Sequence, residues 1–122
     1  MSKTTTKFRG GPNVAMKLPP HHFDKALRFY RDTLGLAVSD HDGGSKLVEF
    51  GPIRLWLDPC PQFSQTELWL EIVADNTDAA ERHLAAAKTV RCDAIEKLPE
   101  DFRGFWISSP ADIVHIVSEQ KG

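Results

Sequence analysis

The two halves of the chain share one order of predicted elements. In the first half, alternating apolar residues over 13–18 predict a strand, and the pattern over 22–34 predicts an amphipathic helix. In the second half, a strand pattern over 67–73 precedes an alanine-rich helix pattern over 79–88. Three predicted strands follow each helix, at 36–39, 46–50 and 53–57 in the first half and at 90–95, 105–108 and 113–118 in the second. The sequence therefore predicts two βαβββ modules, the arrangement that an old internal duplication would leave.

The end of the first predicted helix is marked by the residues FYRDTLGL at 29–36. Apolar residues recur every three or four positions up to this point, which places them on one face of a helix. Gly35 can adopt the left-handed conformation with which many helices end. A helix with one apolar face packs on a sheet, so we expect an α+β fold in which a helix covers one face of each mostly antiparallel sheet. A second sheet or a ligand must then cover the other face.

The composition excludes several classes of protein. The 122 residues, 41% of them hydrophobic and 26% charged, suit one globular domain. No apolar run approaches the roughly 18 residues that a membrane-spanning helix needs, so we expect no membrane partner. The formal net charge is −2 and no run of basic residues occurs, so we expect no nucleic-acid partner.

The predicted organisation is a flexible leader over residues 1–11, followed by a single domain over 12–122. The parts of that domain are module 1 at about 12–58, a proline-containing linker at 59–65 and module 2 at about 66–119. The leader lacks the apolar segment of a signal peptide. Cys60 and Cys92 form no paired motif, so we expect reduced thiols and a cytoplasmic location.

Several short motifs, in this order, resemble the glyoxalase, bleomycin-resistance and extradiol dioxygenase superfamily, also called the vicinal oxygen chelate fold. FYRDTLGL is the most specific match. The first strand NVAMKL, the acidic turn at 75–80 and the last turn and strand at 109–117 also resemble the family pattern. The resemblance spans roughly residues 12–119. It implies two modules whose curved sheets form an open cavity, usually completed in a homodimer.

The resemblance also implies where a metal would be held in the metal-dependent members. Those positions are taken here by Asn13, by Trp56 or Arg54, by Glu67 or Trp69, and by His115. Of these residues only His115 is a strong ligand type, with Glu67 as a possible second ligand. The expected cofactor is therefore either none or a divalent metal held by a divergent set that includes His115 and Glu67.

Strand alternation divides the predicted sheets into two faces. Apolar residues such as Val14, Leu55 and Leu70, with Val114 and Ile116, are expected to pack under the helices. The opposite faces carry Asn13, Ala15, Lys17, Arg54, Trp56, Glu67, Trp69, Glu71, Trp106 and His115. Three tryptophans with a few polar groups suit a small-molecule pocket, with Trp56, Trp69, Trp106, Arg54, Lys17 and Asn13 as the ligand-binding residues.

Structural roles are open for the same residues. The tryptophans could be core or dimer-interface anchors. His115 could be a structural histidine, and Glu71 with Arg54 could be a cross-strand ion pair.

Three functions follow from these readings. The first is a homodimeric protein that binds an aromatic or cationic small molecule in a tryptophan-lined cavity without the usual metal. The alternative is a lyase, isomerase or dioxygenase of the same superfamily, either with a divergent metal site or metal-free, with His115 as acid or base beside Glu71. The third is a purely structural or regulatory dimer.

Overall fold

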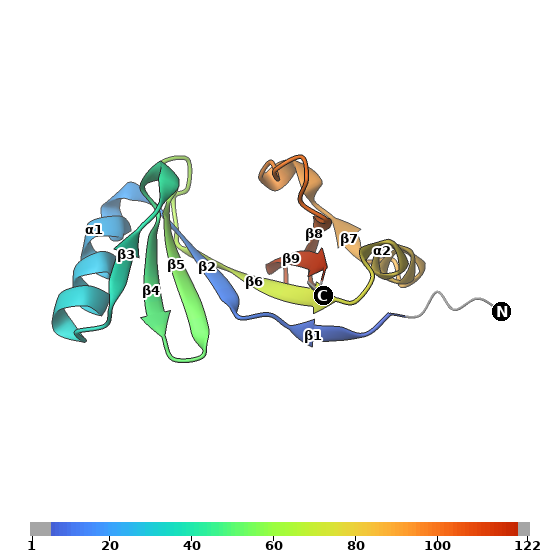
Figure 1. Cartoon of the computed structure of the whole chain (residues 1–122). Coiled ribbons are helices and arrows are strands. Elements are labelled where there is room, and N and C mark those ends of the chain that lie inside the picture. Colours follow the sequence, from blue (N-terminus) through green and yellow to red (C-terminus); the bar gives the residue numbers. More distant parts are fainter. Residues whose placement is uncertain (1–5, 120–122) are drawn as a thin grey trace. The chain divides into compact units, whose positions relative to one another are not determined.

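The computed structural model describes residues 6–119. Contacts between these residues divide the chain into two units, one of residues 12–69 and the other of residues 6–11 and 70–119. In each unit one helix covers one face of a sheet (Figure 1). Each unit has the predicted βαβββ order, so the predicted α+β fold is confirmed.

The unit of residues 12–69 begins with the strand β2. Its elements are β2 (Asn13–Leu18), α1 (Pro20–Arg28), β3 (Val38–Asp40), β4 (Lys46–Phe50), β5 (Ile53–Pro59) and the start of β6 (Glu67–Ala74). A short 3-10 helix, Asp42–Gly44, forms the turn between β3 and β4. The strand order is β3-β4-β5-β2-β6, in which β2 runs parallel to β5 and the other neighbours are antiparallel.

The first helix ends differently from the prediction of one α-helix over 22–34. After α1 the residues Phe29–Thr33 form a π-helical turn, in which the Leu34 amide donates to the Phe29 carbonyl at 2.9 Å. Gly35 follows with φ +73° and the Leu36 amide donates back to the Tyr30 carbonyl at 3.0 Å. The predicted stop at Gly35 is therefore confirmed, but a wider turn precedes it.

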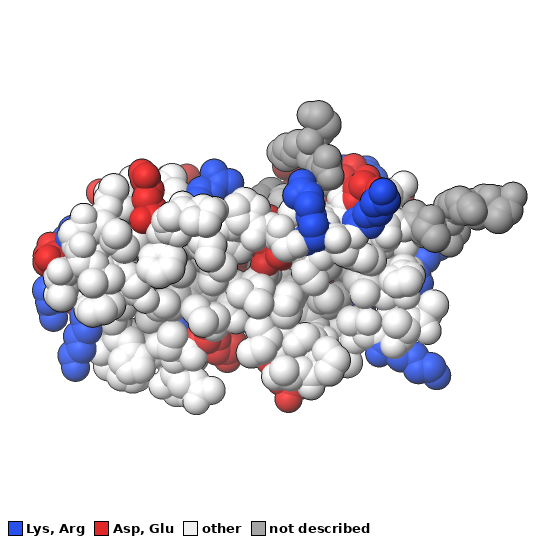
Figure 2. Space-filling view, turned by 90° about the horizontal axis from the view of Figure 1, so that it is seen from below, with Lys and Arg blue, Asp and Glu red and all other residues white. Residues whose placement is uncertain are grey.

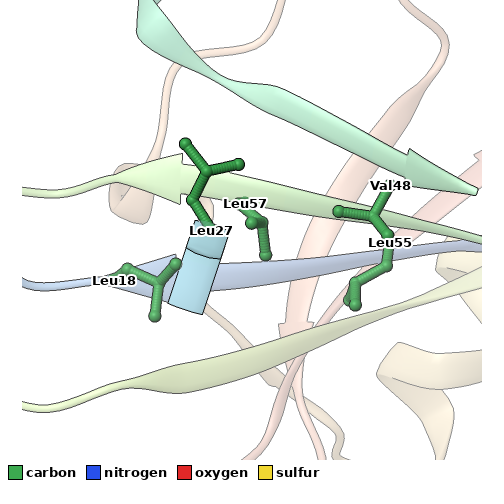
Figure 3. Close-up of a cluster of buried hydrophobic side chains, with 5 residues drawn as sticks. All are labelled: Leu18, Leu27, Val48, Leu55 and Leu57. Carbon is green, nitrogen blue, oxygen red and sulfur yellow. The ribbon is translucent and has the colours of Figure 1, made fainter. Parts of the chain in front are cut away.

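The core of this unit lies between α1 and the sheet. Figure 3 shows its five buried side chains, Leu18, Leu27, Val48, Leu55 and Leu57. Leu57 and Val48 have no exposed surface. Half-buried apolar residues of α1 and β2 complete the cluster, among them Val14, Met16 and Phe23. Apart from Val48, for which no face was predicted, these are residues that strand and helix alternation placed on the buried faces.

The other unit is built on the second half of β6. Its elements are β1 (Phe8–Gly10), α2 (Thr77–Ala86), β7 (Val90–Arg91), a 3-10 turn (Asp93–Ile95), β8 (Gly104–Ser108) and β9 (Val114–Glu119). The strand order is β6-β9-β8-β7, with β6 parallel to β9. The predicted strand over 90–95 is only two residues long here, because the chain turns at Asp93.

The structure differs from the sequence prediction at the start of the chain. Residues 8–10 belong to the stretch predicted as a flexible leader, yet they form β1 and pair antiparallel with β6, Phe8 opposite Ala74 and Gly10 opposite Ile72 (Figure 1). The Gly11 amide also donates to the Glu71 carbonyl at 2.9 Å. The rest of the leader prediction, for residues 1–5, lies outside the described residues, as do residues 120–122 of the predicted domain.

The faces of β9 are the reverse of the prediction. The core under α2 contains Ala74, Ala80, Phe105, Ile107 and Val117. Val117 is opposite Phe105 in the sheet, so Val114 and Ile116 lie on the face away from α2. The prediction that Val114 and Ile116 pack under the helix is therefore wrong.

The start of α2 is capped by a carboxylate from β9. The backbone N–H and the hydroxyl of Thr77 donate to Glu119 Oε1 at 3.0 and 2.8 Å. These donors hold the pKa of Glu119 below its ordinary value, since they stabilise the charged form. The carboxylate thus accepts the Thr77 N–H, which would otherwise lack an acceptor, while Asn76 Oδ1 accepts the N–H of Ala79 at 3.0 Å.

This cap predicts an acid-sensitive contribution to stability. A carboxylate with a lowered native pKa stabilises the fold above its unfolded pKa of about 4.3, and the contribution is lost as pH falls through the native value. We expect Glu119→Gln to flatten the fall in unfolding free energy between about pH 5 and pH 3, measured by urea unfolding. Glu100→Gln, which removes an exposed carboxylate of the same unit, should leave that fall unchanged. Equal pH profiles for wild type and Glu119→Gln would contradict the assignment.

No helix among residues 6–119 is both long enough and apolar enough to cross a membrane. Figure 2 shows one face of the molecule, on which basic and acidic side chains are scattered among uncharged ones.

Candidate functional site

The face of the 12–69 sheet that points away from α1 carries most of the predicted site residues. β2 lies between β5 and β6, so its residues have a neighbour on each side. The rows across the three strands are Arg54 and Asn13, then Trp56, Ala15 and Trp69, then Asp58, Lys17 and Glu67. These positions alternate with the buried Leu55 and Leu57, which face the helix. The fold therefore brings Asn13, Lys17, Arg54, Trp56, Glu67 and Trp69 together on one face.

Lys17, in the row with Asp58 and Glu67, is a buried cation. Its residue is 4% exposed, and its Nζ lies 2.8 Å from Asp58 Oδ2. The same nitrogen lies 4.3 Å from the centre of the Trp69 ring, within range of a cation–π contact. The other carboxylate oxygen, Asp58 Oδ1, accepts the hydroxyl of Ser45 at 2.6 Å. The charge of Lys17 is thus bound by groups of the sheet itself, the Asp58 carboxylate and the Trp69 ring.

Trp69 is built into the same surface. It is 3% exposed, its Nε1–H donates to Glu67 Oε1 at 2.9 Å, and Phe63 lies beside it with ring centres 6.1 Å apart. With Lys17 over its ring, Trp69 has little surface left for a ligand. Its contacts therefore indicate a structural role for Trp69, as a buried ring packed into the sheet face.

Trp56 is the aromatic residue of this face that remains half-buried. Its Nε1–H donates to Asn13 Oδ1 at 2.9 Å, and the His41 ring meets it edge-on with centres 4.8 Å apart. His41 Nε2 lies 3.2 Å from Ser39 Oγ. The indole is therefore held by a hydrogen bond at its nitrogen and by a contact with the His41 ring. His41 was not among the predicted site residues, because its place after the third strand made it look like part of a turn.

Two charged residues lie in the row next to Trp56. Arg54 and Glu49 are exposed and lie opposite each other on β5 and β4. The prediction that Arg54 and Glu71 form a cross-strand pair requires neighbouring strands, whereas β2 separates β5 from β6. Glu49 is thus the residue opposite Arg54 in the sheet.

The remaining predicted residues belong to the other unit. Glu71 and Trp106 lie opposite Ile116 from either side, so they share the face away from α2. His115 lies opposite Leu70 and Ile107, on the helix-covered face, and its Nδ1 is 2.9 Å from the Ile113 carbonyl. The structure therefore does not bring His115 to the face of Glu71.

The contacts of Trp106 and Glu71 hold the local structure together. Trp106 is 6% exposed, its Nε1–H donates to the Glu96 carbonyl at 2.9 Å, and its backbone N–H donates to Asp93 Oδ1 at 3.1 Å. Glu71 Oε2 accepts the Ser118 hydroxyl at 3.3 Å. Trp106 thus fastens the loop that follows β7.

The donor set does not fit the metal that the fold family implies. His115, the strong ligand type among the implied positions, lies on the helix-covered face of its own sheet. Among residues 6–119 no three His, Cys, Asp or Glu side chains come together in a way that could hold a metal ion. No step of the chemistry below is therefore assigned to a metal.

Comparison with solved structures finds the same fold in proteins of low sequence identity. The Mn(II)-bound glyoxalase from Novosphingobium aromaticivorans matches 94% of this chain with a TM-score of 0.69 and 19% identity. The 2,2',3-trihydroxybiphenyl 1,2-dioxygenase from Sphingomonas wittichii strain RW1 matches 90% of it with a TM-score of 0.62 and 19% identity. This chain spans 40% of the length of each of these two proteins.

A third similar structure has the length of this chain. It is a glyoxalase/bleomycin resistance protein/dioxygenase superfamily member from Vibrio splendidus 12B01, with 12% identity and a TM-score of 0.57 over 95% of this chain and 100% of that one. No protein-family model matches the sequence, and comparison with curated proteins found no relative. The chain thus has the fold of the glyoxalase, bleomycin-resistance and dioxygenase superfamily, which the order of its motifs implied.

Proposed function

We propose that this protein binds a planar aromatic or cationic small molecule on the face of the 12–69 sheet around Trp56. The observation that carries the proposal is the state of the Trp56 indole, which is half-buried, hydrogen-bonded to Asn13 and in contact with the His41 ring. A ring held in this way offers a stacking surface that loses little side-chain entropy when a ligand binds. Aromatic faces attract both planar rings and cations.

The neighbours of Trp56 favour a ligand that carries charge. Glu49 and Arg54 are exposed in the row next to the indole. An exposed carboxylate beside an aromatic face suits an organic cation, and the buried Lys17 is held by Asp58 and so adds no free positive charge to the surface. In this proposal the buried Trp69 and Lys17 support the site from within the sheet, and Trp56 is the ring that the ligand contacts.

The proposal predicts that binding depends on Trp56. We expect N-methylquinolinium to bind the full-length protein and Trp56→Leu to weaken that binding roughly tenfold, since one stacked ring contributes about 1–2 kcal/mol. Isothermal titration calorimetry measures the affinities. Phe29→Leu is the matched control, because Phe29 is 47% exposed and belongs to the π-helical turn after α1. Equal affinities for wild type and Trp56→Leu would contradict the proposal.

We further propose that a second copy of the chain pairs with this unit to form a homodimer. The chain matches two fifths of the length of the glyoxalase and of the trihydroxybiphenyl dioxygenase. Phe50 and Ile53 are exposed apolar residues of β4 and β5 on the helix-covered side of the sheet, and they suit a contact with a second copy. Sedimentation equilibrium should give twice the chain mass of 13.7 kDa, and a monomer at micromolar concentration would contradict a homodimer.

A metal-dependent lyase, isomerase or dioxygenase is the second candidate, and the Mn(II)-bound glyoxalase among the similar structures is what favours it. It requires donors that residues 6–119 do not bring together. Elemental analysis of protein purified without chelators tests it, since this candidate predicts one metal ion per chain. We further propose that either activity operates in the cytoplasm, a reducing compartment in which thiols such as that of Cys92 persist.

A further inference from the structure

A cavity of about 460 Å³ lies in the unit of residues 70–119, and none of the residues of the tryptophan face lines it. Its walls are the first turns of α2, the strand β7, the loop at residues 100–103 and the start of β8. Phe105, one of its lining residues, belongs to the core under α2, so the cavity opens on the helix-covered side of the sheet. Its volume is in the range of small-molecule pockets, well above that of a single ion or water.

One wall of this cavity is aromatic. Gly104 has no side chain, and a Cβ at that position would lie 2.5 Å from Cε2 of Phe102. The Phe102 ring therefore occupies the space that a side chain at 104 would fill, and it remains 39% exposed. Next to it, the Arg91 guanidinium lies 4.5 Å from the centre of the Phe105 ring and covers that ring. Phe102 is thus the ring that a ligand can reach.

The charges of the lining favour a cation. The charged residues that line the cavity are four carboxylates and two arginines, so negative charge is in excess: Asp78, Glu81, Glu100, Asp101, Arg91 and Arg103. Both arginines are already engaged. Arg91 lies 2.6 Å from Glu81 and 2.7 Å from Asp93, and Arg103 lies 3.4 Å from Glu119 and 3.7 Å from Asp78. Glu100 and Asp101 are exposed beside Phe102 and are the carboxylates left for a ligand.

The shape of the site selects an organic cation over a metal ion. The carboxylates do not converge in any group of three that could hold a metal within residues 6–119. A cavity of this volume with one accessible ring and spaced carboxylates instead suits an ammonium group attached to an apolar body. We infer that the cavity beside α2 is a second binding site, specific for small arylalkyl or alkyl amines.

Two-dimensional 15N–1H NMR of the full-length protein tests this site directly. Titration with 2-phenylethylammonium should shift the amide signals of residues 77–81, 91 and 100–105, with a dissociation constant of about 1 mM or lower. Phenylacetate has the same ring with the opposite charge, and it should shift those signals at least tenfold less at equal concentration. Higher salt should weaken the amine binding, because the attraction is between exposed charges.

Variants that neutralise carboxylates distinguish binding at this cavity from a general attraction of cations to the acidic protein. The double variant Glu100→Gln/Asp101→Asn should weaken binding of 2-phenylethylammonium roughly tenfold, as expected for two lost exposed ion pairs. Asp24→Asn/Asp112→Asn changes the net charge by the same amount at exposed positions away from the cavity, and it should bind as wild type does. Unchanged affinity in the first variant, no shift of the cavity signals, or equal binding of phenylacetate would each overturn the inference. The Trp56 site can fail its own test without affecting these results.

Discussion

Leu57→Ala should lower the free energy of unfolding by about 2–5 kcal/mol, the largest stability effect that this structure predicts for a single substitution. Leu57 has no exposed surface and lies at the centre of the cluster between α1 and the sheet (Figure 3). Truncation removes the apolar contacts and leaves a cavity that the surrounding strands cannot fill. Urea unfolding followed by circular dichroism measures the change.

Leu68→Ala is the matched control for this prediction. It is the same chemical change in another strand, but Leu68 is 46% exposed. We expect a loss of less than about 1 kcal/mol, because little buried surface is removed. Similar losses for the two variants would show that the cluster under α1 is not the core of this unit.

Asp58→Ala should destabilise the protein by about 2–3 kcal/mol. The substitution takes from the buried Lys17 a carboxylate at 2.8 Å, and it leaves the hydroxyl of Ser45 without its acceptor. A buried cation that loses a partner carries its desolvation cost uncompensated. Lys17→Met/Asp58→Ala should therefore be more stable than the sum of the single losses predicts, by at least about 1 kcal/mol in a double-mutant cycle. Strict additivity would contradict the coupling.

An exposed pair of the same geometry gives the control. Lys46 Nζ lies 2.8 Å from Asp40 Oδ1, but the Asp40 side chain is 85% exposed, against 19% for Asp58. We expect Asp40→Ala to cost less than about 1 kcal/mol, because water replaces the lost contact. The contrast between Asp58 and Asp40 measures what burial adds to an ion pair at constant distance.

Local patterns predicted those parts of the fold that depend on local physics. Gly35 ends the helix because the left-handed conformation there costs a glycine little, and the sequence shows it. Clean alternation along β2 and β5 placed Asn13 and Trp56 on one face, where they form a hydrogen bond. The sequence could not show that bond, since it joins residues 43 positions apart.

The errors have physical reasons as well. Val114, Ile116 and Val117 are all β-branched and two of them, Val114 and Val117, are buried, so alternation along β9 does not choose between its faces. β1 was missed because a three-residue strand has no periodicity, and only its pairing with β6 defines it. His41 was missed because its contact with Trp56 is made across the sheet rather than along the sequence.

The claim that Trp56 is the ligand-contacting ring can be tested by its own NMR signal. The chain has three tryptophans and therefore three indole N–H resonances, which Trp56→Phe, Trp69→Phe and Trp106→Phe assign. Saturation of the full-length protein with N-methylquinolinium should shift the Trp56 resonance most, because its ring is half-buried, while Trp69 and Trp106 are 3% and 6% exposed. A Trp56 resonance that does not move while the ligand binds would contradict the assignment of this face as the binding site.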